Sequence, residues 1–156
     1  KHAVNFVQQL SKVYRHILEV KNEKSIFLLE EMEVLNAYAF LLQTRFGTNL
    51  VVNINIPSEK MKKKIVPLSL QLLMENAIKH NAVSKETPLE ITIGLKNKNK
   101  LVIKNNINPK ITREPGTGTG LQNIIKRYSL LSNEPVFINN DGTYFTVILP
   151  VLNKTD

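Results

Sequence analysis

Polar residues of several chemical types crowd one short stretch of the chain, Glu75-Asn-Ala-Ile-Lys-His-Asn81. Asn76 and Lys79 are three residues apart, so on a helix they project from the same side. An amide oxygen beside an ammonium group can hold a divalent cation and the phosphates that it bridges, because magnesium prefers a few oxygen ligands. The alternative is an amphipathic helix with an ordinary polar face.

The residues before and within this stretch predict the helix that carries it. Pro67 suits a first helical turn, because its fixed φ favours a helix start and its missing N–H is not needed there. The apolar residues that follow recur at helical spacing and predict a buried face; they are Leu70, Leu73, Met74, Ala77 and Ile78.

A second stretch with chemical potential is Gly116-Thr-Gly-Thr-Gly-Leu121, just before a predicted helix. Alternating glycines let backbone N–H groups approach an anion, and the helix N-terminus adds partial positive charge. The pattern lacks the lysine of a P-loop and follows an irregular loop, not the strand of a dinucleotide-binding turn. Arg127, in the following helix, reaches a phosphate or is solvated; the sequence leaves both open.

The elements around these stretches predict an α+β fold with antiparallel strand pairs covered by helices on one side. Apolar stripes indicate helices near residues 3–19, 30–46 and 121–131, and the first of these has no partner for its stripe. Alternating or β-rich runs indicate strands near 50–56, 89–95, 101–103, 136–138 and 143–151, with a short strand at 25–29. Residues 105–120 are predicted to form a loop without its own core.

Composition limits the classes of function. The chain has 156 residues, no cysteine and only three histidines, so disulfides and thiolate metal sites are excluded. Its formal net charge of +8 includes the run Lys60-Met-Lys-Lys-Lys64. We interpret this run as a solvated loop and expect no nucleic-acid partner, because few aromatic residues accompany the basic ones. No apolar run has the length of a membrane span, and because the chain begins at Lys1 we interpret it as a piece of a longer protein.

Together these stretches resemble the Bergerat-fold ATP-binding domain of histidine kinases over essentially the whole chain. Glu75–Asn81 is similar to the N-box of that family, Gly116–Leu121 to its second glycine box, and Gly142–Pro150 to its closing strand. The likeness is greatest to the LytS-type sensor kinases. It is carried by Ser11–His16, Leu29–Glu33, Tyr38, Arg45-Phe46, Glu75–His80, Gly120–Ile124 and Arg127-Tyr128.

The resemblance implies a two-layer α/β sandwich at residues 23–156, preceded at residues 1–22 by the C-terminal helix of a dimerisation region. It implies that Asn76 is the metal ligand, and that Glu75, Lys79 and His80 are catalytic. The residues that it assigns to cofactor binding are Asn76, Asn81, Asn105, Gly116, Thr117, Gly118, Thr119, Gly120, Leu121 and Thr146. The cofactors are ATP and Mg²⁺.

The sequence departs from the family pattern at two places. The first glycine box, normally Asp-x-Gly-x-Gly, is Asn105-Asn-Ile-Asn-Pro109 here, so an asparagine stands at the adenine-binding aspartate. The phosphoacceptor motif, similar to Asn-Pro-His-Phe, does not occur, and neither His2 nor His16 matches it. We interpret His16 as a packing or surface residue.

The function that the resemblance implies is transfer of the ATP γ-phosphoryl group to a histidine on a missing upstream segment, and then to an aspartate of a response regulator. A homodimer through the N-terminal helices, a parent protein anchored upstream in a bacterial inner membrane and a cytoplasmic location for this portion are further implications. One alternative is a hydrolytic Bergerat-fold ATPase, and another is a degenerate nucleotide pocket that serves only dimerisation or docking.

Overall fold

The computed structural model describes residues 1–112 and 118–153 of the chain. Its α-helices in this part are α1 (His2–Val20), α2 (Leu28–Phe46), α3 (Ser69–His80) and α4 (Thr119–Leu131), with short 3-10 helices at Gly47–Asn49 and Ser58–Lys60. Its strands are β1 (Ile26–Phe27), β2 (Leu50–Ile54), β3 (Lys64–Ile65), β4 (Leu89–Lys96), β5 (Lys100–Asn106), β6 (Phe137–Asn140) and β7 (Tyr144–Pro150).

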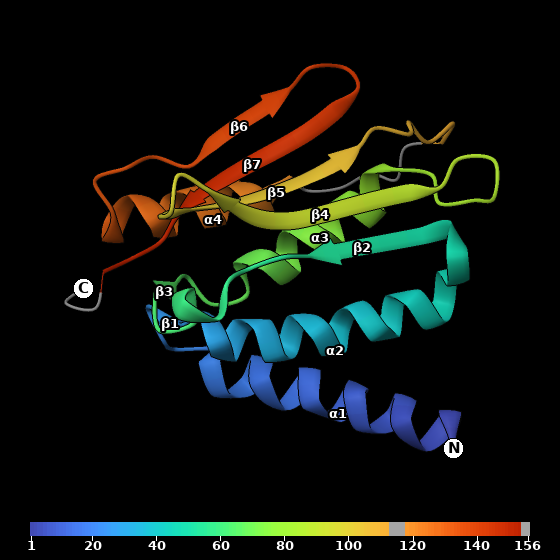
Figure 1. The fold of residues 1–156 in the computed structure, drawn as a ribbon, viewed down its shortest axis with the longest axis horizontal. Helices are drawn as coiled ribbons and strands as arrows, with labels where there is room; N and C mark the ends of the chain where they lie inside the picture. The colour runs from blue at the N-terminus through green and yellow to red at the C-terminus, as the bar shows by residue number, and fades with distance from the viewer. Residues whose placement is uncertain (113–117, 154–156) are drawn as a thin grey trace.

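A five-stranded mixed sheet with the order β2-β4-β5-β7-β6 is the centre of the fold (Figure 1). Strands β4, β5, β7 and β6 pair antiparallel, while β2 pairs with β4 in parallel. Helix α3 lies on the connection between the two parallel strands, because such a pair needs a long crossover. The predicted α+β class is therefore confirmed.

The core lies between one face of this sheet and the helices. In β4 the side chains of Leu89, Ile91 and Ile93 are buried, and those of Glu90 and Thr92 between them are exposed. This alternation is expected of a sheet that is covered on one face and open on the other. Helices α3 and α4 lie behind the sheet in Figure 1, and α2 runs below them along β2.

Helix α1 is a separate layer outside α2 (Figure 1). Its Val13 packs with Val34 and Ala37 of α2 in a small cluster of buried residues distinct from the main core. The opposite face of α1 leaves Tyr14 62% and Leu18 74% exposed, together with Val4, Val7 and Leu10. The predicted stripe is thus divided: Val13 and Ile17 pack on α2, whereas its other residues are exposed.

Three local features differ from the sequence prediction. Lys64 does not lie in a loop but pairs in β3 with Phe27 of β1. Helix α3 begins at Ser69, and Leu68 before it has a left-handed backbone with φ 65°, so Pro67 is outside the first turn. Asn105 and Asn106 belong to β5, because the pairing with β7 continues to Asn106. Each difference depends on contacts with distant segments.

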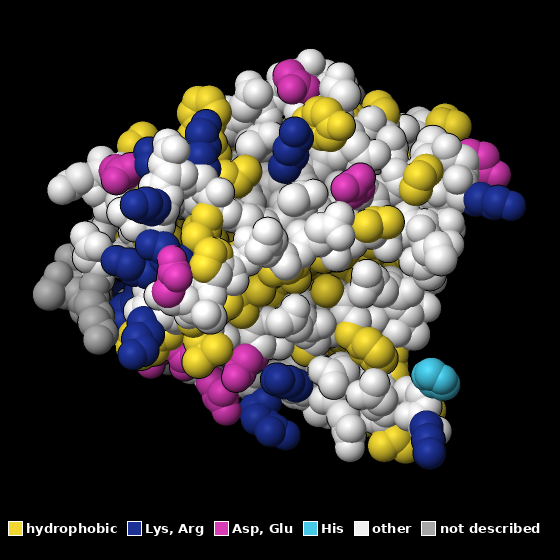
Figure 2. Space-filling model, viewed as in Figure 1, with side chains coloured by type: hydrophobic (Ala, Val, Ile, Leu, Met, Phe, Trp, Pro, Cys, Tyr) yellow, Lys and Arg dark blue, Asp and Glu magenta, His cyan; other side chains and the backbone are white. Residues whose placement is uncertain are grey.

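In Figure 2 the face over the sheet is mostly white and yellow, with separate charged side chains between. Figure 2 shows Lys and Arg side chains gathered at the end of the molecule that carries β1 and β3. Within residues 1–112 and 118–153, no helix combines the length and the apolar character that crossing a lipid bilayer requires.

Candidate functional site

The side chain of Asn76 lies against the first turn of α4. A Cβ placed on Gly120 would stand 3.9 Å from the Oδ1 atom of Asn76, which is ordinary van der Waals contact. The amide oxygen of Asn76 therefore faces Gly120 in this turn. The structure therefore brings together one residue from each of the two stretches that were singled out in the sequence.

Gly118 gives α4 its starting geometry. It is the N-cap residue with φ 65° and ψ 7°, a left-handed conformation that glycine adopts readily. Having no side chain, it leaves the N-terminal turn of α4 unobstructed from this position. A helix N-terminus carries partial positive charge and directs N–H groups outward, so it attracts an anion. An oxygen ligand for a cation thus lies beside a region that favours a phosphate.

The other polar residues of α3 lie on different sides of the helix. Lys79, three residues after Asn76, is half-buried, whereas His80 is exposed. Glu75 is exposed and lies towards α2: burial, and after it the charge of Glu75, raises the pKa of Tyr38 to about 12. Lys79 and His80, three and four residues after Asn76, therefore both lie on its side of the helix, whereas Glu75 is about 100° away.

Asn81 connects the end of α3 to the chain that follows β5. It is buried, its Nδ2 donates to the carbonyl oxygen of Ala77 at 2.9 Å, and its Oδ1 accepts from the N–H of Asn108 at 2.7 Å. A second bond between these segments runs from the N–H of Ala82 to the carbonyl oxygen of Asn108 at 2.8 Å. Asn81 therefore fixes the segment at Asn108 against the end of α3.

Asn105 lies on the helix-covered face of the sheet. It is buried and pairs in register with Ile91 of β4 and Phe145 of β7. Its Nδ2 donates to the carbonyl oxygen of Asn106 at 2.8 Å, which fixes the orientation of the amide. Asn105 is thus on the same side of the sheet as α3, three residues before the segment that Asn81 holds.

Thr146 lies away from the other predicted site residues. Thr146 pairs in register with the exposed Lys104, so its side chain projects from the open face of the sheet, opposite to Asn105. The register therefore does not bring Thr146 to the face that carries Asn76 and Asn105. Gly116 and Thr117 lie outside the described residues. Of the remaining glycine-box residues, Thr119 is exposed and Leu121 packs against the core.

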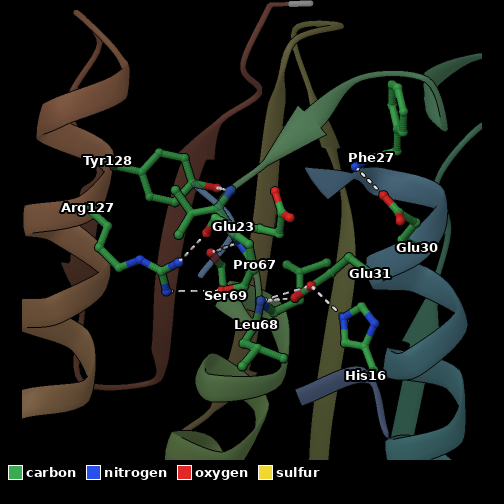
Figure 3. A network of polar contacts seen from close by, with 12 residues as sticks. His16, Glu23, Phe27, Glu30, Glu31, Pro67, Leu68, Ser69, Arg127 and Tyr128 are labelled. Atoms are coloured by element: carbon green, nitrogen blue, oxygen red, sulfur yellow. Dashed lines mark hydrogen bonds and ion pairs between the residues drawn. The ribbon is translucent and has the colours of Figure 1, made fainter. Parts of the chain in front are cut away.

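A buried polar junction at the other end of α3 was missed by the sequence prediction (Figure 3). Arg127 donates to the carbonyl oxygen of Pro67 at 3.3 Å and to that of Glu23 at 3.5 Å, so it neither faces the glycine turn nor lies free in solvent. Next to it, the hydroxyl oxygen of the buried Tyr128 accepts from the N–H of Val66 at 3.4 Å.

Glu31 is the charged residue at the centre of this junction, and its side chain is fully buried. Its two oxygens accept from the N–H groups of Leu68 at 2.9 Å and Leu70 at 3.1 Å. Burial raises the pKa of Glu31 to about 7, although the backbone N–H groups favour its ionised form. The signal in the sequence is its position in the apolar stripe of α2, three residues after Leu28 and four before Leu35.

Comparison with known proteins shows the relatives of this chain. The family model described as histidine kinase matches residues 1–50. The chain is 30% identical to the sensor protein LytS of Enterococcus faecalis over 146 residues, 83% of this chain and 25% of that protein. It is 26% identical to the sensor histidine kinase/phosphatase LytS of Staphylococcus aureus over 162 residues, 91% of this chain and 28% of that protein.

Solved structures show the same fold. The catalytic domain of histidine kinase ThkA superposes with a TM-score of 0.54 at 17% identity, over 81% of this chain and 97% of that domain. The Acinetobacter baumannii histidine kinase AdeS gives 0.53 at 18% identity, over 94% of this chain and 77% of the other. The chain therefore has the fold of a histidine kinase catalytic domain. It is a homologue of the LytS-type sensor histidine kinases and spans about a quarter of their length.

Proposed function

We propose that this chain is the ATP-binding catalytic region of a two-component sensor histidine kinase. In this proposal it transfers the γ-phosphoryl group of ATP to a histidine on a segment upstream of Lys1, from which the group passes to an aspartate of a response regulator. The observation that carries the proposal is the position of the Asn76 amide oxygen at the first turn of α4, 3.9 Å from where a Cβ on Gly120 would lie.

The residues present fit a magnesium nucleotide. Asn76 supplies a neutral oxygen ligand, and the open face of Gly120 admits phosphate oxygens to the first turn of α4. Lys79 adds positive charge on the side of Asn76. Bound Mg²⁺ neutralises phosphate charge, which is the main requirement in phosphoryl transfer together with positioning. Asn105, on the same side of the sheet, is the residue that we assign to the adenine base.

The arrangement favours a kinase over a hydrolytic ATPase. By the family resemblance, hydrolytic members place a water-activating glutamate one turn before the metal-binding asparagine, and here that position is the apolar Leu72. Glu75, adjacent to Asn76, lies about 100° away around the helix and towards Tyr38 of α2.

The proposal extends to partners and location. Four exposed apolar residues of α1 are spaced by three, seven and four positions, as on a helix that packs against another helix; they are Val4, Val7, Tyr14 and Leu18. We assign residues 1–22 to the dimerisation region and residues 23–156 to the catalytic domain, with a second copy of the chain as the partner of α1. A membrane anchor upstream and a cytoplasmic position for this region complete the proposal.

Nucleotide titration tests the binding site. We expect a fluorescent ATP analogue to bind the chain more tightly with magnesium than without it, and Asn76→Ala to abolish that difference while circular dichroism stays unchanged. Asn36→Ala, an exposed asparagine on α2, is the matched control and should bind as the parent chain does. An Asn76→Ala variant that keeps the full magnesium effect would refute the assignment.

Phosphoryl transfer is tested separately with labelled ATP. The isolated chain should remain unlabelled, because neither His2 nor His16 stands in an acceptor motif. A fragment of the parent protein that carries the upstream helix should gain acid-labile label when it is added. Label mapped to His2 or His16 would contradict the proposal, and release of inorganic phosphate without any acceptor would support the hydrolytic alternative.

A further inference from the structure

The first turn of α3 is held by a carboxylate from another helix. The first N–H groups of a helix lack intrahelical acceptors, and a cap usually comes from a residue next to them in sequence. Here Leu68 is the N-cap residue and makes no side-chain cap hydrogen bond. Glu31, 37 residues away, accepts from the N–H groups of Leu68 and Leu70. Its charge also faces the positive end of the α3 dipole.

This contact holds a strained backbone. Leu68 has φ 65° and ψ 9°, a left-handed conformation that a non-glycine residue adopts at a cost on the order of 1 kcal/mol. Such a conformation persists only when the surroundings hold it. The hydrogen bond from Leu68 to the Oε2 atom of Glu31, at 2.9 Å, is that restraint.

The junction and the candidate site lie at opposite ends of the same pair of helices. At one end, Arg127 of α4 bonds to Pro67 before α3; at the other, Gly120 of α4 lies against Asn76 of α3. Helices α3 and α4 therefore run antiparallel. Asn76 is six residues beyond Leu70, about 9 Å along the helix axis. A tilt of α3 at the junction therefore changes the spacing between Asn76 and Gly120.

Helix α1 reaches the same carboxylate. The Nε2 atom of His16 lies 4.0 Å from the Oε2 atom of Glu31, and no hydrogen-bond partner for it is found among the described residues. The His16 side chain is only 12% exposed. The turn after α1 also takes part, because Arg127 bonds to the carbonyl oxygen of Glu23. A movement of α1 by about 1 Å towards α2 would bring His16 into hydrogen-bond range of Glu31.

We propose that Glu31 is a positioning residue for the nucleotide site, and that its contact with His16 couples the position of α1 to nucleotide affinity. The inference rests on the proposed function, since it takes the Asn76–Gly120 region to be where nucleotide binds. Ionised Glu31 holds the start of α3; a donor from α1, or a proton, competes with the two N–H groups for its oxygens.

The titration of Glu31 is a readout that distinguishes its role as a charged hydrogen-bond acceptor from a role in packing alone. The groups that face it are His16 from α1, Arg127 and Tyr128 from α4, and the backbone N–H groups of α3. Its pKa of about 7 places its titration within the stable range of most proteins. Desolvation lowers the pKa of His16, which is opposite in direction to the shift of Glu31.

The first test follows backbone amide resonances of the whole chain between pH 5.5 and 8.5, without nucleotide. We expect the amides of Leu68, Leu70, Asn76 and Gly120 to shift with one midpoint near 7, and this midpoint to vanish in Glu31→Gln. The amide of Gly94, in β4 outside the helix pair, is the internal control. If Leu68 titrates while Asn76 and Gly120 do not, Glu31 caps α3 without positioning the site, and the inference is wrong.

The second test measures Mg-ATP affinity. In Glu31→Gln one carboxamide oxygen replaces two carboxylate oxygens, so one N–H loses its acceptor. We expect affinity at pH 8 to fall by about fivefold or more, the lower range of typical coupling. Glu33→Gln, an exposed glutamate on the same helix, should bind as the parent does. If Glu31→Gln binds Mg-ATP as the parent does, the inference is wrong. If the parent chain itself does not bind Mg-ATP, the proposed function is wrong instead.

The role of α1 is tested by a double-mutant cycle. His16→Ala admits water to Glu31, so we expect the midpoint of the Asn76 and Gly120 shifts to move to lower pH. In the Glu31→Gln background His16→Ala should leave nucleotide affinity unchanged, because the group through which it acts is gone. Equal effects of His16→Ala in both backgrounds would show that α1 does not act through Glu31.

Discussion

The substitution Gly120→Ala tests whether the first turn of α4 binds phosphate, without disturbing the fold of that helix. Gly120 is helical, and its φ does not lie in the left-handed range. The added Cβ meets its nearest neighbour, the Oδ1 atom of Asn76, at 3.9 Å, so no atom of the protein has to move. The fold therefore accepts the methyl group, but the group occupies the approach to Asn76.

The two consequences have opposite signs. Alanine in a helix is more stable than glycine by roughly 0.5–1 kcal/mol, chiefly because the unfolded chain loses conformational freedom. For a chain of this size that gain raises the melting temperature by about 1–4 °C. A phosphate that contacts the first turn of α4 beside Asn76 meets the new methyl group. We expect Mg-ATP affinity to fall by about tenfold or more, which corresponds to about 1.4 kcal/mol.

Calorimetric melting and fluorescence titration of the same samples measure both effects. Gly94→Ala in β4 is the matched control: its Cβ would meet only the carbonyl oxygen of Asn55 at 3.5 Å, and it lies outside the helix pair of the site. This variant should keep parent affinity. A Gly120→Ala protein that is more stable yet binds Mg-ATP as tightly as the parent would refute the placement of phosphate at this turn.

Three further variants test other parts of the structure. Asn105→Asp should tighten ATP binding by several-fold to about tenfold in equilibrium titration, because a carboxylate makes stronger hydrogen bonds than an amide; weaker binding would contradict the adenine assignment. Because the folded pKa of Glu31 is raised from 4.5 to about 7, its stabilising contribution is complete below pH 4.5 and is lost as the pH rises through 7. Urea unfolding of the parent at pH 4.5 and 8 should therefore show about 3 kcal/mol less stability at pH 8, relative to Glu31→Gln; parallel curves would exclude the raised pKa. Tyr128→Phe should lower the free energy of unfolding by about 1–2 kcal/mol, since the N–H of the buried Val66 loses its acceptor; an unchanged urea midpoint would show that this bond contributes little.

Local patterns in the sequence predicted most of the elements of this fold. The stripe from Leu70 to Ile78 predicted α3, and the alternation after Leu89 predicted β4, because burial on one face imposes the period of each element. The fold class and the family follow from the same patterns and from the two polar stretches. The boundary at Ser69 was missed, since the left-handed Leu68 depends on Glu31, which is distant in sequence.

The arrangement of the site was less accessible to sequence reasoning. The spacing of Asn76 and Lys79 placed them on one side of α3, but their position against Gly120 depends on how α3 and α4 pack. The sequence left two possibilities for Arg127, contact with a phosphate or exposure to solvent. Its actual partners, the carbonyl oxygens of Pro67 and Glu23, leave no pattern in the sequence, because any residue offers a carbonyl oxygen.

The position of β2 in the sheet has a consequence for the order in which the molecule assembles. Strands β4, β5, β7 and β6 pair antiparallel, and a turn of a few residues joins β4 to β5. Strand β2 instead pairs Leu50 with Leu89 at the sheet edge, and closing that long loop costs more chain entropy. We therefore expect the antiparallel strands to form first and β2 to join late, carrying α1 and α2 with it. The candidate site then forms with this late step, because α3, which bears Asn76, lies on the crossover from β2 to β4.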